Sequence, residues 1–259
     1  MRCKHLNPMI GFILILILVS LGCAFVQPAS DLSTSTPESA TTSTVVSTNT
    51  PRPSATPRPT RTPNLVATQH AEEMNAEVQA YFDKGYLATT DGTFKELDDF
   101  QDDWAQLGWY NWLPLNEAAS DFYMGAHLKW SSAYQSADIS GCGFIFSLQE
   151  NKDHYAVFLD RMKVLFLITD HTVGSSRPVA PTRGTGRVKF GNPAEADFTL
   201  IVKDAYAYVL VDGKEVGEYT LAQSRPLSGN LGLTVLSGTN KGYGTHCEMS
   251  NLHLWIPKE

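Results

Sequence analysis

The chain is poor in lysine and arginine, and these bases are unevenly distributed. Of 259 residues, 20 are Lys or Arg and 27 are Asp or Glu. Residues 1–64 contain five of the bases and two of the acids, so residues 65–259 carry a net charge of about −10. An acidic body without a basic cluster lacks the charge that binds phosphate backbones. We therefore expect no nucleic-acid partner.

Several catalytic and metal-binding signatures are also missing. The sequence has no His-Glu-x-x-His motif, no Cys-x-x-Cys pair and no Gly-x-Ser-x-Gly elbow. Their absence argues against the zinc, dithiol redox and serine hydrolase sites that these spacings build. His154 and His171 flank predicted turns and can meet in space, but the sequence assigns them no role.

The amino terminus has the features of an export signal. Arg2 and Lys4 precede an apolar run from Met9 to Leu21. The run ends in Ser20-Leu21-Gly22-Cys23, which resembles a bacterial lipobox, although the usual leucine three positions before the cysteine is replaced by Ser20. Residues 1–26 are thus a lipoprotein signal peptide with Cys23 as the lipidated residue, or an uncleaved membrane anchor. Either places the body on the extracytoplasmic face of the cell membrane.

Residues 27–64 are predicted to be a disordered linker. From Pro28 to Asn64, 24 of 37 residues are Ser, Thr or Pro. Such a segment buries too little apolar surface to offset the entropy of ordering. We expect it to act as a spacer between the membrane and the body.

The four cysteines lie in three different parts of the chain. Cys3 lies in the charged amino-terminal region and Cys23 is the candidate lipid acceptor, which leaves Cys142 and Cys247 in the body. Two cysteines in an exported domain favour a disulfide over free thiols. Both lie in apolar-alternating runs next to glycines, where cross-strand pairing is possible. Two buried thiols are the alternative.

Residues 65–90 are predicted to contain a lead-in helix, and residues 91–259 a β-rich domain. From Thr68 to Lys84 apolar residues recur every three or four positions, which favours a helix that packs on the body; an interaction helix is the alternative. After Asp91 the apolar period becomes two. The predicted strands are 122–130, 142–148, 154–160, 163–169, 198–202, 206–211, 216–219, 231–235 and 248–256. This order predicts an all-β fold, an antiparallel sandwich.

Five segments of the body carry a family resemblance. They are Gly-Cys-Gly-Phe-Ile-Phe (141–146), Asp-His-Tyr-Ala-Val (153–157), Tyr-Val-Leu-Val-Asp-Gly-Lys-Glu-Val (208–216), residues 229–239 and residues 243–255. Together they resemble the concanavalin A-like lectin/glucanase jelly roll, particularly laminin-G-like and 3-keto-disaccharide hydrolase-like bacterial domains. The resemblance covers about residues 98–255 and implies an antiparallel jelly-roll sandwich. It implies no catalytic residue, because no catalytic motif of the family is present, and it does not specify an activity, because the fold hosts lectins, enzymes and adhesion modules alike.

The acidic residues do not form the glycosidase pattern of this fold. Retaining glycosidases that resemble it carry Glu-x-Asp-x-x-Glu on one strand, and that string is absent. The nearest acidic cluster consists of Glu96, Asp98, Asp99, Asp102 and Asp103. It is interpreted as a solvated turn or helix cap, with a calcium site or catalytic carboxylates as alternatives.

Aromatic residues are concentrated between positions 104 and 112. Trp109, Tyr110 and Trp112 are candidates for ligand binding, because sugar rings stack on aromatic faces. Tyr123, Tyr134 and Tyr243 are candidate helpers. The alternative is that these rings cover one sheet of the sandwich, with Trp104 as a core residue.

Three functions remain open from the sequence. The preferred one is a membrane-tethered extracytoplasmic domain that binds carbohydrate or another cell-surface ligand without catalysis. The second is a glycan- or disaccharide-processing hydrolase with acids such as Asp98, Asp99 or Asp138 assembled in space. The third is a structural or protein-interaction module. No cofactor is expected apart from the possible calcium ion.

Overall fold

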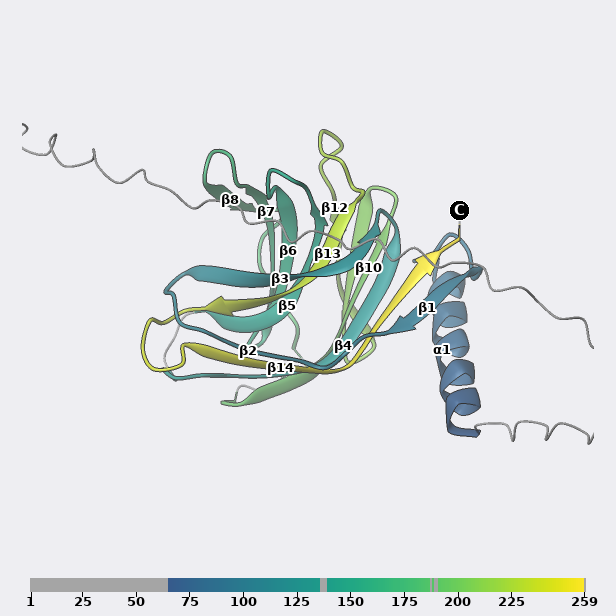
Figure 1. Ribbon diagram of the computed structural model, residues 1–259, viewed down its shortest axis with the longest axis horizontal. Helices are drawn as coiled ribbons and strands as arrows, with labels where there is room; N and C mark the ends of the chain where they lie inside the picture. The colour runs from purple at the N-terminus through teal and green to yellow at the C-terminus, as the bar shows by residue number, and fades with distance from the viewer. Residues whose placement is uncertain (1–64, 136–138, 187, 189–190, 259) are drawn as a thin grey trace, which may run out of the picture. The chain divides into compact units, whose positions relative to one another are not determined.

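The computed structural model describes residues 65–135, 139–186, 188 and 191–258 (Figure 1). Cys23, the export signal or anchor at 1–26 and the linker at 27–64 lie outside these residues and stay predictions. Among the described residues, no helix is both long enough and apolar enough to cross a bilayer.

Two antiparallel sheets form a sandwich. Sheet A has the order β1-β14-β4-β10-β11-β12, with β2 also paired to β14. Sheet B has the order β3-β13-β5-β6-β7-β8, with β9 also paired to β7. The strands of sheet A are β1 (Gly92–Glu96), β2 (Phe100–Trp104), β4 (Phe122–Ser132), β10 (Ala194–Lys203), β11 (Tyr206–Val211), β12 (Lys214–Thr220) and β14 (Thr245–Pro257). Those of sheet B are β3 (Trp109–Ala119), β5 (Ser140–Leu148), β6 (His154–Asp160), β7 (Lys163–Asp170), β8 (Ser175–Pro178), β9 (Arg183–Gly184) and β13 (Gly229–Ser237).

The chain passes repeatedly between the sheets, which confirms the predicted jelly-roll sandwich. It moves from β3 in sheet B to β4 in sheet A, then back to β5. The last two strands, β13 and β14, are inserted between earlier strands of the two sheets. Six of the twelve strand pairs among the described residues therefore join strands that are far apart in the sequence.

Period-two alternation places the core between the sheets. In β4, every second residue from Phe122 to Trp130 faces the other sheet and is buried. Phe144 and Phe146 of β5 fill the same core from sheet B. The predicted Asp212-Gly213 turn joins β11 to β12, and both residues have positive φ, 49° and 70°.

The predicted disulfide joins the two sheets. Cys142 on β5 and Cys247 on β14 are bonded, with Cα atoms 5.9 Å apart, and both are fully buried. The bond thus links strands that are 105 positions apart in the sequence through the core. It is therefore a covalent link between the two sheets.

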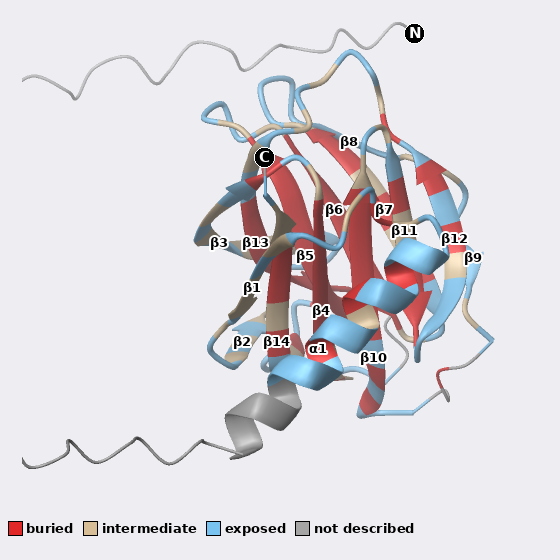
Figure 2. Ribbon diagram, turned by 90° about the vertical axis from the view of Figure 1, so that its right-hand side faces the viewer, coloured by how far each residue is buried: buried red, intermediate tan, exposed pale blue. Residues whose placement is uncertain are grey.

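Helix α1 (Leu65–Asp83) covers part of the outer face of sheet A (Figure 2). It begins three residues before the predicted helix and buries Met74, Val78 and Tyr81, while Ala71 on the predicted apolar stripe is exposed. Val78 and Tyr81 pack in one cluster that also contains Tyr123, Ile201, Leu210 and Trp255. The helix packs on the body, as predicted, and makes the first half of β4 buried on both faces.

Candidate functional site

An aromatic cluster lies on the outer face of sheet B. Strand β3 directs Tyr110 and Trp112 to this face, where they stand opposite Leu236 and Thr234 of β13. The ring centroids of Tyr110 and Trp112 are 5.8 Å apart. His154 on β6 lies against both rings, with its centroid 5.7 Å from that of Tyr110 and 5.1 Å from that of Trp112. Two of the three predicted aromatic residues therefore meet a histidine.

These aromatic residues border a hollow of about 430 Å³, which we call the β3 groove. Its volume lies within the range of small-molecule sites, about 300–1,000 Å³. Trp109, which is 60% exposed, lines it together with Tyr110 and Trp112. Other lining residues are Gly108, Ile139, Leu165, Leu167, Thr169, Asp170, His171, Gly174, Ser176 and Leu236. The groove therefore combines an apolar floor with a few polar groups.

A directed series of hydrogen bonds holds Tyr110 in place. His154 Nδ1 lies 2.7 Å from the carbonyl oxygen of Lys152, which can only accept, so Nδ1 carries the proton. His154 Nε2 then accepts from the Tyr110 hydroxyl at 2.8 Å. The Tyr110 oxygen in turn accepts from Thr169 Oγ1 at 2.6 Å, and Thr169 Oγ1 accepts from Ser176 Oγ at 2.9 Å. The series fixes the ring of Tyr110 and ends at the groove lining.

Burial keeps this series uncharged. It is the main reason that the pKa of His154 lies below its usual 6.5; the hydrogen bond to Lys152 opposes the shift and the nearby His171 adds to it. Burial likewise raises the pKa of Tyr110, although the hydrogen bonds to Thr169 and Ser176 reduce the rise. At neutral pH, His154 is therefore a neutral acceptor and Tyr110 a neutral donor.

Charged groups lie at one side of the groove. Arg225 Nη1 donates to the carbonyl oxygen of Thr169 at 2.7 Å, and Arg225 Nη2 lies 3.6 Å from Asp170 Oδ2. The backbone N–H of His171 donates to Asp153 Oδ1 at 2.8 Å. His154 and His171 are thus neighbours, as the sequence allowed.

The structure separates the other predicted aromatic residues from the groove. Tyr123 is wrong as a helper: it is fully buried under α1, on the opposite sheet, and its hydroxyl contacts His253. Tyr134 is 43% exposed and stacks with Lys241, and Tyr243 is 42% exposed near Ser131. Neither lines the groove.

Trp104 packs against the core and is partly buried, as predicted. Its Nε1 donates to the carbonyl oxygen of Trp109 at 3.2 Å. The chain between these two residues crosses from β2 in sheet A to β3 in sheet B. Because of this crossing, Trp104 packs against the core although Trp109, which lines the groove, is only five positions away in the sequence.

The predicted acidic cluster is spread over β1, β2 and their connection. Asp102 accepts from Asn111 Nδ2 at 3.4 Å, and Asp103 Oδ1 lies 2.5 Å from His246 Nδ1. Among the described residues, no three His, Cys, Asp or Glu side chains converge as metal ligands. Asp138 lies outside the described residues. Calcium binding stays an untested prediction.

The groove residues Leu165, Leu167, Thr169 and Ser176 were not singled out from the sequence. In β6 and β7 both alternate sets are apolar: Ala156 and Phe158, like Leu165 and Leu167, face outward and yet are buried or partly buried. A strand that is apolar on both faces predicts cover or a binding surface on its outer side. This was the signal that could have located the groove.

Comparison with known proteins finds similarity in architecture. No protein-family model and no curated protein matches the chain. The chain is similar to the carbohydrate-binding module CBM66 of Bacillus subtilis. That alignment has 12% identity and a TM-score of 0.46, and covers 61% of this chain and 92% of the module.

Two enzymes give comparable alignments. A native glycosidic hydrolase has 12% identity and a TM-score of 0.44, over 67% of this chain and 99% of the hydrolase. The β-glucanase of Bacillus licheniformis has 11% identity and a TM-score of 0.41, over 55% of this chain and 69% of the glucanase. At these values the similarity concerns the β-sandwich alone, and the site is interpreted from its own residues.

Proposed function

We propose that the protein binds carbohydrate in the β3 groove, on a domain tethered to the extracytoplasmic face of the cell membrane. The observation that carries the binding proposal is the aromatic floor of Tyr110 and Trp112, held by His154 and bordered by hydroxyl and carboxylate groups. Sugar rings present apolar C–H faces to aromatic planes and hydroxyls to polar groups. The groove offers both.

Binding without hydrolysis is favoured by the groove's acidic content. Glycoside hydrolysis commonly uses two carboxyl groups about 5 to 9.5 Å apart on either side of the scissile bond. Among the described lining residues, Asp170 is the single carboxylate, and it is paired with Arg225. A carboxylate that is paired with an arginine is held in place and can accept a hydrogen bond from a sugar hydroxyl.

Calorimetric titration of the purified full chain with ligands chosen from a glycan array tests the proposal. Trp112→Ala is expected to weaken binding at least about fivefold, because loss of one stacking aromatic ring costs on the order of 1–3 kcal/mol. The matched control is Tyr206→Ala, which removes an exposed aromatic ring from sheet A. No array binding, or equal losses in both variants, would contradict the proposal, and release of shorter glycans would establish the hydrolase alternative.

Tethering is tested separately at Cys23. Lipidation predicts that the cell-expressed chain incorporates a radiolabelled fatty acid and begins at Cys23, and that Cys23→Ser abolishes the label. A chain of full mass that stays in the membrane without label would establish the uncleaved anchor instead. Release of the wild-type chain into the medium would contradict both.

A further inference from the structure

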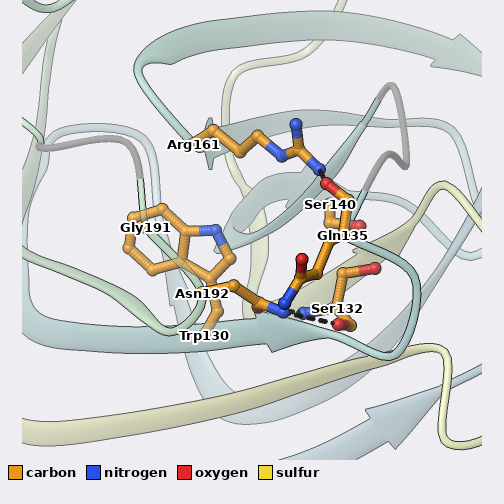
Figure 3. Close-up of a pocket in the computed structure, with 7 residues that line it drawn as sticks. All are labelled: Trp130, Ser132, Gln135, Ser140, Arg161, Gly191 and Asn192. Carbon is orange, nitrogen blue, oxygen red and sulfur yellow. Dashed lines mark hydrogen bonds between the residues drawn. The ribbon is translucent and has the colours of Figure 1, made fainter.

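A second, polar pocket of about 250 Å³ lies between the sheets at one end of the sandwich (Figure 3). It is formed where β4 ends, β5 begins, β6 turns into β7 and the chain enters β10. Its deep part consists of Trp130, Ser132 and Ser140, which are 2%, 5% and 1% exposed. Gln135, Arg161, Gly191 and Asn192 line the rest of it, nearer the mouth.

Two buried side chains in this pocket have no hydrogen-bond partner within the described part of the chain. They are the indole Nε1 of Trp130 and the hydroxyl of Ser140. In Figure 3 the indole nitrogen is directed toward the side of the pocket where Ser140 lies. Leaving such groups unpaired in a folded protein is unfavourable, so buried polar groups of this kind normally contact another molecule or a catalytic partner.

Several of the surrounding polar groups are already engaged. Asn192 Oδ1 accepts from the backbone N–H of Ser132, and Asn192 Nδ2 donates to the Ser132 carbonyl oxygen, both at 2.8 Å. The Ser132 hydroxyl donates to the carbonyl oxygen of Tyr134 at 3.0 Å. The backbone N–H of Ser140 donates to Asp160 at 2.9 Å. These contacts fix the walls and leave the indole N–H and the Ser140 hydroxyl for a ligand.

The chemistry of these two groups defines what fits. An indole N–H only donates, so it needs an oxygen that accepts, whereas a serine hydroxyl donates and accepts. A vicinal diol or a sugar ring supplies both roles from neighbouring oxygens. The pocket, of about 250 Å³, is small and suits a ligand of the size of one sugar residue.

We propose that Trp130 and Ser140 form a second ligand site, which binds a single hydroxyl-bearing sugar residue at the end of the sandwich. The site is distinct from the β3 groove. Ile139, which directly precedes β5, lines the groove on the outer face of sheet B, whereas Ser140, the first residue of β5, lines the pocket between the sheets. The proposal therefore does not depend on glycan binding in the groove.

Nuclear magnetic resonance of the ¹⁵N-labelled full chain tests it. The five tryptophan indole signals are assigned on the wild-type protein by through-bond experiments, and the chain is titrated with glucose, galactose, mannose, fructose and glucuronate. Binding is expected to move the Trp130 indole signal in a saturable way with at least one of these sugars. An unmoved Trp130 signal with all five would mean that the pocket holds water only and would overturn the proposal.

Two variants separate this site from the groove. Ser140→Ala removes one hydroxyl without adding bulk. It is expected to weaken the binding of the sugar that moves the Trp130 signal by about fivefold, the loss typical of one neutral hydrogen bond. Trp112→Ala is expected to leave that titration unchanged while it weakens binding in the groove. Unaltered affinity in Ser140→Ala, or an equal loss in Trp112→Ala, would assign the signal change to another site and overturn the proposal.

Discussion

The hydroxyl of Tyr110 on β3 donates to His154 Nε2 on β6 at 2.8 Å, across two intervening strands. Across sheet B, Tyr110 is paired with Leu236 of β13, Leu236 with Gly141 of β5, and Gly141 with Asp160 of β6. His154 lies six residues from Asp160 along β6. In a flat sheet the two Cα atoms would be about 25 Å apart, given about 4.8 Å between strands and 3.4 Å per residue. Sheet B must therefore coil diagonally over its outer face, and this coiling creates the β3 groove.

Removing the Tyr110 hydroxyl tests this relationship. Tyr110→Phe leaves buried His154 Nε2 without its donor and Thr169 without one acceptor, so the free energy of unfolding is expected to fall by about 1–3 kcal/mol in urea denaturation. Tyr206→Phe, which changes an exposed ring on sheet A, is the control and is expected to have no effect. Equal stability of the two variants would show that the hydrogen-bonded series does not hold the sheet.

Protonation of His154 is expected to destabilise the protein in mild acid. The unfolded chain takes up this proton near pH 6.5, whereas burial lowers the pKa in the folded chain. The contribution of neutral His154 to the free energy of unfolding is therefore fully present above pH 6.5. It decreases as the pH falls below 6.5, and the decrease ends below the pKa of His154 in the folded chain. His154→Gln keeps an acceptor for Tyr110 but does not titrate.

The measurement is urea denaturation of both proteins between pH 8 and pH 4. The free-energy difference between wild type and His154→Gln is expected to shift in favour of the variant as the pH decreases through about 6.5. Glycan affinity in the groove of the wild-type protein is also expected to decrease as the pH decreases, because protonated His154 no longer accepts a hydrogen bond from Tyr110. A difference that is independent of pH would contradict the role given to His154.

Asp160 is expected to have the opposite dependence on pH. Burial, partly offset by the hydrogen bond from Ser140, raises its pKa from 3.8 to about 6. A carboxyl group with a raised pKa adds to the free energy of unfolding when it is protonated. This added stability is fully present below pH 3.8 and is lost as the pH increases through about 6. Asp160→Asn retains an acceptor for Ser140 N–H and should raise the free energy of unfolding at pH 8 by up to about 3 kcal/mol. Calorimetry at pH 3.5 and pH 8 checks this: the gain should be absent at the lower pH.

The disulfide is expected to contribute substantially to stability. It closes a segment of 105 residues, and cross-links of that length stabilise by about 2–5 kcal/mol. The double variant Cys142→Ser, Cys247→Ser should lower the free energy of unfolding by this amount, measured by urea denaturation against the oxidised wild type. Reduced wild-type protein should match the double variant; if reduction leaves the stability unchanged, the bond is not formed in solution.

Much of the sandwich was predictable because its residues alternate. The alternation of Phe122 to Trp130 located β4 and its core face, and the spacing of Met74, Val78 and Tyr81 located α1. Strand β2 was not predicted, since Phe100–Trp104 contains two aspartates and pairs with β14 at the sheet edge. Tyr123 was assigned to the wrong environment, because strand alternation cannot show that α1 covers that face.

The residues alone predicted the class of fold and favoured the pairing of Cys142 with Cys247, both of which the structure confirms, and they marked the aromatic residues near Trp112 as candidates. These depend on local period and on the number of available partners, which are visible along the chain. The meeting of Tyr110 with His154, and of Trp130 with Ser140, depends on how the sheets coil and which strand ends come together. Alternation along a strand shows which residues share a face of the sheet. Which of these residues touch depends on the coiling of the sheets, and this coiling arises from the twist summed over many non-local strand pairs.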